Sequence, residues 1–230
     1  MEHLLTIYHG SSQVVDTPAF GLGRKNNDFG LGFYCTESND LAKEWAVSSL
    51  RDGFSNRYTL DTEHLRVLNL NSPDYTILNW IAVLVENRLF SIKNPNARRA
   101  KQYLIDHFGI NVNAYDLITG YRADDSYFDF AEAFLNNAIT AEQLSRAMRL
   151  GKLGEQIVLK SRFAFSKIRF EGFEIAEKDR YYVLRKARND EANRSYLDIQ
   201  EEENDGLFMQ DILRGGITNG DPRIPGNVSK

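Results

Sequence analysis

Two glycines stand beside two aromatic residues in one stretch of this chain, Asp28-Phe-Gly-Leu-Gly-Phe-Tyr-Cys-Thr36. Gly30 and Gly32 allow the backbone a positive φ or a close approach to a ligand. Phe33 and Tyr34 offer flat faces on which a planar ring can stack. Because a hydrophobic core alone does not require this mixture, the stretch predicts the floor of a site for a heteroaromatic ligand.

A histidine lies at the end of the short apolar segment Leu4–Tyr8, in the run Tyr8-His9-Gly10-Ser11. The pattern predicts a strand that delivers His9 to a glycine turn. Neutral histidine has one donor and one acceptor, and Gly10 exposes its backbone amide and carbonyl groups, which suits a ribose and a carboxamide. The alternative is that His9 simply caps a strand end, since a lone histidine is a weak signal.

Trp45 lies eleven residues after Tyr34, on a helix that we expect to begin with Asp40 as its N-cap. That distance is enough for the indole to fold back over the aromatic stretch. The periodicity is equally consistent with Trp45 as a core residue.

Two further pairs of polar residues could act on a substrate. Glu155 and Gln156 open a predicted strand, 155–159, and only one of them can enter a cleft because neighbouring strand residues face opposite ways. Asp124 and Asp125 could form an acid/base couple or a metal site, but they could also cap the helix predicted over 126–135.

The remaining patterns predict a mixed α+β fold that would position these residues. We expect strands at 56–60, 65–70 and 115–120, and a helix at 96–108. A helix over 76–90, capped by Asp74, should be largely buried through Trp80–Val85. Thr140 and Gln143 form a capping-box pattern for a helix that ends near residue 150.

The composition excludes several classes of protein. Cys35 is the only cysteine, so neither an intrachain disulfide nor a cysteine zinc cluster can form, and no metal is expected. No apolar run reaches the roughly 18 residues of a membrane helix, so we expect no membrane partner and a cytoplasmic protein. A net charge of −4 argues against binding nucleic acid by overall charge.

The C-terminal part changes in character, so the sequence divides into residues 1–176, which carry the motifs, a helical extension over 177–214, and a tail over 215–230 that we expect to be disordered. Basic and aromatic residues alternate between Arg180 and Arg188. They indicate either contact with nucleic acid or an ordinary amphipathic helix.

Taken together, the motifs resemble the ADP-ribosyltransferase fold, in the branch of diphtheria toxin and the poly(ADP-ribose) polymerases. That branch carries His, Tyr and Glu on three successive core segments. Tyr8-His9-Gly10-Ser11, Gly32-Phe33-Tyr34 and Glu155-Gln156-Ile157-Val158 follow the same order.

More narrowly, the chain resembles a family of bacterial mono-ADP-ribosyltransferases formerly catalogued as a domain of unknown function. The shared motifs lie between about Ile7 and Phe173 and read Tyr-His-Gly-Ser, Asp-Phe-Gly-x-Gly-Phe-Tyr-x-Thr, Tyr-Asp-x-x-x-Gly-x-x-Ala-Asp-Asp and Gln-Ile-Val. An ordered match of several motifs is fairly specific, whereas any one of them alone is not. The resemblance implies a split β-sheet core surrounded by helices in residues 1–176.

The resemblance also implies a site for NAD as co-substrate. His9 would bond the adenosine ribose, and the Gly10 backbone would hold the nicotinamide carboxamide with Ser11 nearby. Tyr34 and Trp45 would enclose the nicotinamide ring. Gln156 would stand where the family has its catalytic acid, or Glu155 would if the strand register slips by one. Asp124 and Asp125 belong to the pattern without a role that we can derive.

The implied activity is transfer of one ADP-ribose to a macromolecular acceptor, protein or nucleic acid, by a toxin or phage-defence effector that an antitoxin or inhibitor protein could restrain. A neutral Gln156 accepts a hydrogen bond but cannot serve as a general base, so we expect single transfer and no chain elongation. One alternative is a degenerate module that binds NAD or a partner protein without turnover. Another is transfer to phosphate, as in NAD-dependent RNA phosphotransferases, although basic residues do not cluster near the motifs in the sequence.

Overall fold

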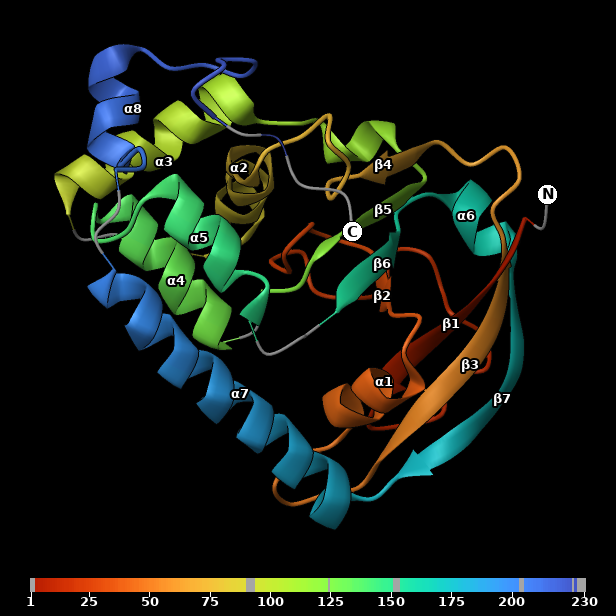
Figure 1. Cartoon of the computed structure of the whole chain (residues 1–230). Helices are drawn as coiled ribbons and strands as arrows, with labels where there is room; N and C mark the ends of the chain where they lie inside the picture. The colour runs from red at the N-terminus through yellow and green to blue at the C-terminus, as the bar shows by residue number, and fades with distance from the viewer. Residues whose placement is uncertain are drawn as a thin grey trace.

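Seven strands form two separate sheets in the part of the chain that the structure, a computed structural model, describes (Figure 1). This part comprises residues 3–89, 94–123, 125–150, 154–202, 205–224 and 226, without the side chains of 125–127. The strands are β1 (Leu4–Ser11), β2 (Phe33–Cys35), β3 (Gly53–Asp61), β4 (Val67–Asn69), β5 (Leu117–Tyr121), β6 (Glu155–Leu159) and β7 (Ile168–Ala176). The helices are α1 (Asn39–Ala46), α2 (Ile77–Asn87), α3 (Pro95–Phe108), α4 (Asp125–Leu135), α5 (Ala141–Ala147), α6 (Arg162–Ser166), α7 (Lys178–Glu201) and α8 (Met209–Gly215).

Within the described residues, one backbone bridge joins the two sheets. One sheet has the order β1-β3-β7, and the other has the order β2-β6-β5-β4, in which only β4 and β5 run parallel. Tyr8 of β1 and Thr36 exchange two backbone hydrogen bonds of 2.8 and 2.9 Å. The predicted α+β class is therefore confirmed.

A small hydrophobic core joins the inner faces of the sheets. Ile7, Tyr58 and Leu60 come from the first sheet, and Cys35 and Ile157 come from the second. Their alternation with outward residues is what a strand with one buried face requires. This core fixes β1 against β2 and so places the two predicted motifs side by side.

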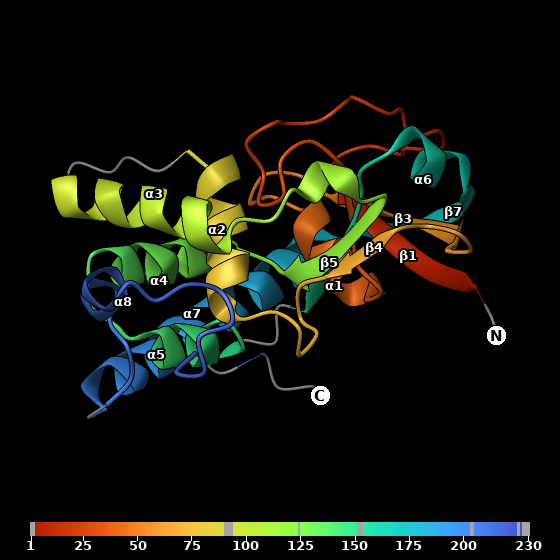
Figure 2. The same cartoon turned by 90° about the horizontal axis from the view of Figure 1, so that it is seen from above.

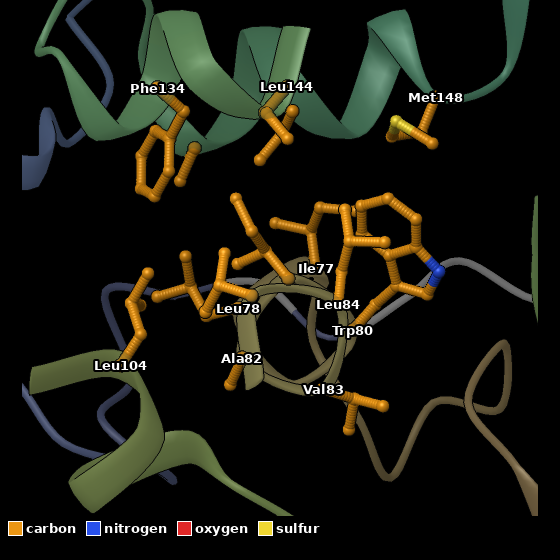
Figure 3. Packing of buried hydrophobic residues seen from close by; sticks show 14 of the residues in the cluster. Ile77, Leu78, Trp80, Ala82, Val83, Leu84, Leu104, Phe134, Leu144 and Met148 are labelled. Carbon is orange, nitrogen blue, oxygen red and sulfur yellow. The ribbon is translucent and has the colours of Figure 1, made fainter. Parts of the chain in front are cut away.

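A larger core surrounds α2 at the other end of the molecule, where the helices gather (Figure 2). Trp80–Val85 is fully buried, as predicted, because α2 has neighbours on all sides. Figure 3 shows α2 between Leu104 of α3 and the residues Phe134, Leu144 and Met148 of the α4–α5 region.

The structure confirms one predicted helix start and corrects two others. Thr140 and Gln143 form the predicted capping box of α5. The α1 helix is capped by Ser38, whose Oγ accepts from the Leu41 N–H at 3.3 Å, and not by Asp40. Thr76 and not Asp74 caps α2. In both helices the N-cap residue carries a hydroxyl group, which accepts a hydrogen bond from one of the free backbone N–H groups of the first turn.

The C-terminal segments pack onto the rest of the chain. The long helix α7 runs along α1 and on towards α4 and α5 (Figure 1). Beyond α8, Ile217 and Ile224 are buried, so the disorder predicted from residue 215 does not begin there. None of the helices that the structure describes is long and apolar enough to cross a membrane.

Candidate functional site

One cavity of about 660 Å³ collects most of the residues that the sequence singles out. His9, Ser11, Tyr34, Trp45 and Gln156 all line it. They come from β1, β2, α1 and β6, and most residues of the loop 13–23 also line the cavity. Gly10 contributes no surface to this lining.

His9 is held as a neutral ring with a defined tautomer. Its Nδ1 lies 2.7 Å from the Tyr34 carbonyl, which can only accept, so Nδ1 carries the hydrogen and Nε2 is the acceptor of the ring. The ring packs against Phe33 with 4.4 Å between centroids. Burial lowers the pKa of His9 below its ordinary value, which the bond to Tyr34 opposes only in part. At neutral pH the cavity therefore contains an uncharged histidine whose Nε2 can accept a hydrogen bond from a hydroxyl group.

Gly10 lies against α1 and leaves its backbone groups on the open edge of β1. A Cβ at Gly10 would stand 2.1 Å from the Ala42 carbonyl oxygen, so only glycine allows this contact. Tyr8 directs its N–H and C=O away from β3 towards Thr36, and in an antiparallel strand Gly10, two residues later, directs its own to the same side. The neighbouring Ser11 Oγ accepts from the Gln13 N–H at 3.3 Å.

Tyr34 presents its ring to the cavity because its hydroxyl is bound within its own loop. The hydroxyl donates to the Gly30 carbonyl at 2.6 Å and accepts from the Phe29 N–H at 3.1 Å. Gly30 has a φ of 73°, which favours glycine. Burial raises the pKa of Tyr34 far above its usual range, so the phenol stays protonated.

Lys160, the residue that follows β6, anchors the same loop. Its Nζ donates to the carbonyls of Phe29 and Leu31, both at 2.7 Å. Burial lowers the pKa of this ammonium group to about 8. The aromatic stretch is therefore fixed to the strand that carries Gln156.

Trp45 lies beneath Arg122, whose guanidinium carbon stands 4.4 Å from the centroid of the indole ring. The indole N–H is buried, and no described group accepts its hydrogen. One face of Trp45 is thus occupied by a cation. A ring bound between Tyr34 and Trp45 would need the other face or a shift of Arg122.

Gln156 is the member of the Glu155–Gln156 pair that lines the cavity, whereas Glu155 is absent from the lining within the described part of the chain. Gln156 is only 4% exposed. Its Nε2 donates to Asp28 Oδ2 at 2.7 Å and to the Tyr121 carbonyl at 3.3 Å. Since both bonds use the amide N–H groups, Oε1 is left as the acceptor.

Asp28 is a cavity residue for which sequence reasoning gave no role. It is 5% exposed and also accepts from the Ala123 N–H at 2.9 Å, while Arg88 Nε lies 3.0 Å from its Oδ1. Burial raises the pKa of Asp28, and Arg88 is the first of several groups that oppose this shift. Its place at the head of the Asp-Phe-Gly motif was the signal available in the sequence.

Two arginines line the cavity, contrary to the expectation that basic residues do not gather near the motifs. Arg88 and Arg122 reach it from the end of α2 and from the turn after β5. Asp124 and the side chain of Asp125 lie outside the described residues.

The helix α7 packs against α1, which carries Trp45. Glu44, 2% exposed at its side chain, forms a bidentate ion pair with Arg188, through bonds of 3.1 and 2.8 Å. Arg185 donates to the backbone carbonyls of Glu44 and Val47. These two members of the basic and aromatic run therefore hold α7 against α1.

Comparison with known proteins gives one match. A family model described as a protein of unknown function (DUF3990) matches residues 5–170, which is more than half of the chain. No curated protein and no solved structure matches. The matched residues include every residue described above as lining the cavity and end before α7.

Proposed function

The chain belongs to the DUF3990 family of proteins of unknown function, and we propose that it is a mono-ADP-ribosyltransferase that uses NAD. The observation that carries this proposal is that His9, Tyr34, Trp45 and Gln156, from four separate segments, line one cavity. Two small sheets that meet at β1 and β2 are compatible with the split core of that fold. The motifs and the cavity support the proposal together, because fold alone does not define an activity.

In the proposed complex, four cavity residues and the neighbouring backbone edge at Gly10 each bind one part of NAD. The Nε2 of His9 accepts from a hydroxyl of the adenosine ribose, and the open backbone groups of Gly10 bind the carboxamide. The ring of Tyr34 stacks on nicotinamide, and Trp45 closes over it. The Oε1 of Gln156 accepts from the 2′-hydroxyl of the nicotinamide ribose.

The reaction breaks the bond between C1′ of the ribose and the nicotinamide nitrogen. The electron pair of that bond leaves with the nitrogen, which neutralises the pyridinium, and positive charge develops on the sugar. A lone pair of the acceptor forms the new bond to C1′, and the acceptor's proton passes to solvent. Gln156 orients the sugar but supplies neither net charge nor a base, so one ADP-ribose is transferred per acceptor.

The proposal is tested by incubating the purified protein with labelled NAD and a bacterial lysate. Label should enter macromolecules with the wild type and should be lost with Tyr34→Ala. Tyr103→Ala is the matched control, since Tyr103 also bonds a backbone carbonyl, that of Ile217, but lies outside the cavity lining. Sensitivity of the labelled product to nuclease or protease identifies the acceptor class. Binding of NAD with neither label transfer nor nicotinamide release would favour the module without turnover.

A second candidate is transfer of ADP-ribose to a phosphate group, and the observation that favours it is the presence of Arg88 and Arg122 on the cavity wall. Guanidinium groups bind phosphate well. Label that enters an oligonucleotide only when it carries a terminal or 2′-phosphate would support this acceptor. Equal labelling of the dephosphorylated oligonucleotide would exclude it.

A further inference from the structure

We propose that Asp28 is the positioning residue for Gln156, and that the two side chains together replace the single glutamate that the resemblance to ADP-ribosyltransferases leads us to expect. This inference rests on the proposed function. It assigns a role to a buried carboxylate in the cavity that the proposed binding of NAD does not otherwise use.

Asp28 and Tyr121 define the orientation of the Gln156 amide. Asp28 Oδ2 and the Tyr121 carbonyl are both acceptors, and both face Nε2. Rotating the amide by 180° would place Oε1 against two oxygen atoms, which removes both hydrogen bonds. Asp28 therefore keeps Oε1 as the atom available to a sugar hydroxyl.

The second feature of the Asp28–Gln156 pair is its charge. An acid at position 156 would lie within hydrogen-bonding distance of Asp28, since Gln156 Nε2 is 2.7 Å from Oδ2. Two carboxyl groups that close cannot both ionise, so one of them would retain a proton. The pair of Asp28 and Gln156 carries one negative charge without that conflict. The charge is displaced from the sugar by the length of one amide.

Groups from several structural elements hold Asp28 in place. Arg88 at the end of α2 lies 3.0 Å away, the Ala123 N–H after β5 lies 2.9 Å away, and Arg122 and Tyr34 are the further charged or titratable groups nearby. Burial raises the pKa of this carboxyl, and hydrogen bonds and the arginines favour the ionised form. A carboxylate with this support can fix the amide without moving itself.

If Asp28 had only a structural role, its replacement should affect the protein in the same way as replacement of Asp116. Asp116 is therefore the matched control. Asp116 is also 5% exposed, accepts from the Arg66 backbone N–H at 2.9 Å and pairs with the Arg66 guanidinium at 3.2 Å. It does not line the cavity. Asp116→Asn therefore reproduces the loss of a buried carboxylate that pairs with an arginine, without disturbing Gln156.

The experiment is a swap of the two side chains, with nicotinamide release from NAD as the assay. Asp28→Asn removes the negative charge of the pair, and Gln156→Glu places a second carboxyl group beside the first, so that one of the two must retain a proton. Each should lower kcat about tenfold or more, while KM for NAD changes much less. The double variant Asp28→Asn/Gln156→Glu restores one charge and one amide donor, and its kcat should exceed that of the slower single variant about tenfold or more. Asp116→Asn should keep the wild-type kcat.

The inference is decided by the following outcomes. Recovery of kcat in the swap supports it. The inference is overturned if the loss of kcat in the double variant equals the product of the losses in the two single variants. It is also overturned if Asp28→Asn has the same kcat as Asp116→Asn. If Asp28→Asn fails to fold, the folded swap decides by its own activity. A wild type that releases no nicotinamide refutes the proposed function and this inference together, whereas an active wild type with an inert swap refutes only the inference.

Discussion

Gly10→Ala should displace the helix that carries Trp45. The added Cβ would lie 2.1 Å from the Ala42 carbonyl oxygen and 3.0 Å from the Ala46 nitrogen, whereas ordinary contact begins at 3.4 Å. Both are backbone atoms of α1, so no side-chain rotation relieves the overlap, and α1 must move by about 1 Å or β1 must bend. Overpacking of this kind costs about 3 kcal/mol of unfolding free energy. For a chain of this size that lowers Tm by about 6–12 °C.

The assay compares Gly10→Ala with Gly109→Ala by thermal unfolding and NAD titration. At Gly109, which does not line the cavity, a Cβ would meet the Ile105 carbonyl oxygen at 2.3 Å, a similar overlap. Both variants should lose stability. Only Gly10→Ala should also lose nicotinamide release, about 100-fold, because a 1 Å displacement of a substrate-positioning group can cost that much. An unchanged Tm for Gly10→Ala, or equal losses of release in both variants, would refute the reasoning.

Three further predictions concern groups around the cavity. Arg188→Leu leaves Glu44 buried without its partner and should cost about 3–5 kcal/mol of unfolding free energy; the double variant Arg188→Leu/Glu44→Met should recover most of it in urea titrations, and no recovery would contradict the ion-pair argument. Tyr34→Phe should keep NAD affinity but lose about 1–2 kcal/mol of stability with its two hydroxyl bonds, and a large loss of affinity would show that the hydroxyl itself binds. His9 has a pKa below 6.5 in the folded protein, so the unfolded chain takes up its proton first as pH falls, and the stability that neutral His9 contributes is lost from pH 6.5 downwards. His9→Asn should have a flatter dependence of the urea midpoint between pH 7.5 and 5, and identical slopes would contradict this assignment.

Local patterns in the sequence were sufficient for much of the fold. The buried run Trp80–Val85 and the capping box of Thr140 depend on residues within one helix, so their periodicity could be read directly. The strand β7 and the burial of Ile217 and Ile224 were not predicted. Phe173 and Ile175 of β7 are exposed, and the two tail isoleucines are buried only because helices from other parts of the chain cover them.

The candidate site was predictable in its members but not in its connections. Strand alternation showed that only one of Glu155 and Gln156 could face a cleft, but choosing between them required the register of β6 against β2, in which Ile157 pairs with Cys35. Asp28 and Gln156 are 128 residues apart, so no local pattern reveals their bond. A polar residue ahead of a glycine motif is ordinarily solvated, and only the packing of α2 and β5 around Asp28 makes it a buried group.

The single bridge between Tyr8 and Thr36 has a mechanical consequence. Elsewhere each sheet is held by several backbone bonds, whereas among the described residues two backbone bonds, 2.8 and 2.9 Å long, and the bond from His9 Nδ1 to the Tyr34 carbonyl cross the junction of the two sheets. The junction therefore depends mainly on side-chain packing, and hydrogen exchange of the Tyr8 and Thr36 amide protons reports on how firmly it is closed. A molecule that formed hydrogen bonds with the open edge of β1 at Gly10 would add a link beside this junction. It would slow hydrogen exchange at the amides of Tyr8 and Thr36 and leave the exchange rates in the middle of β3 unchanged.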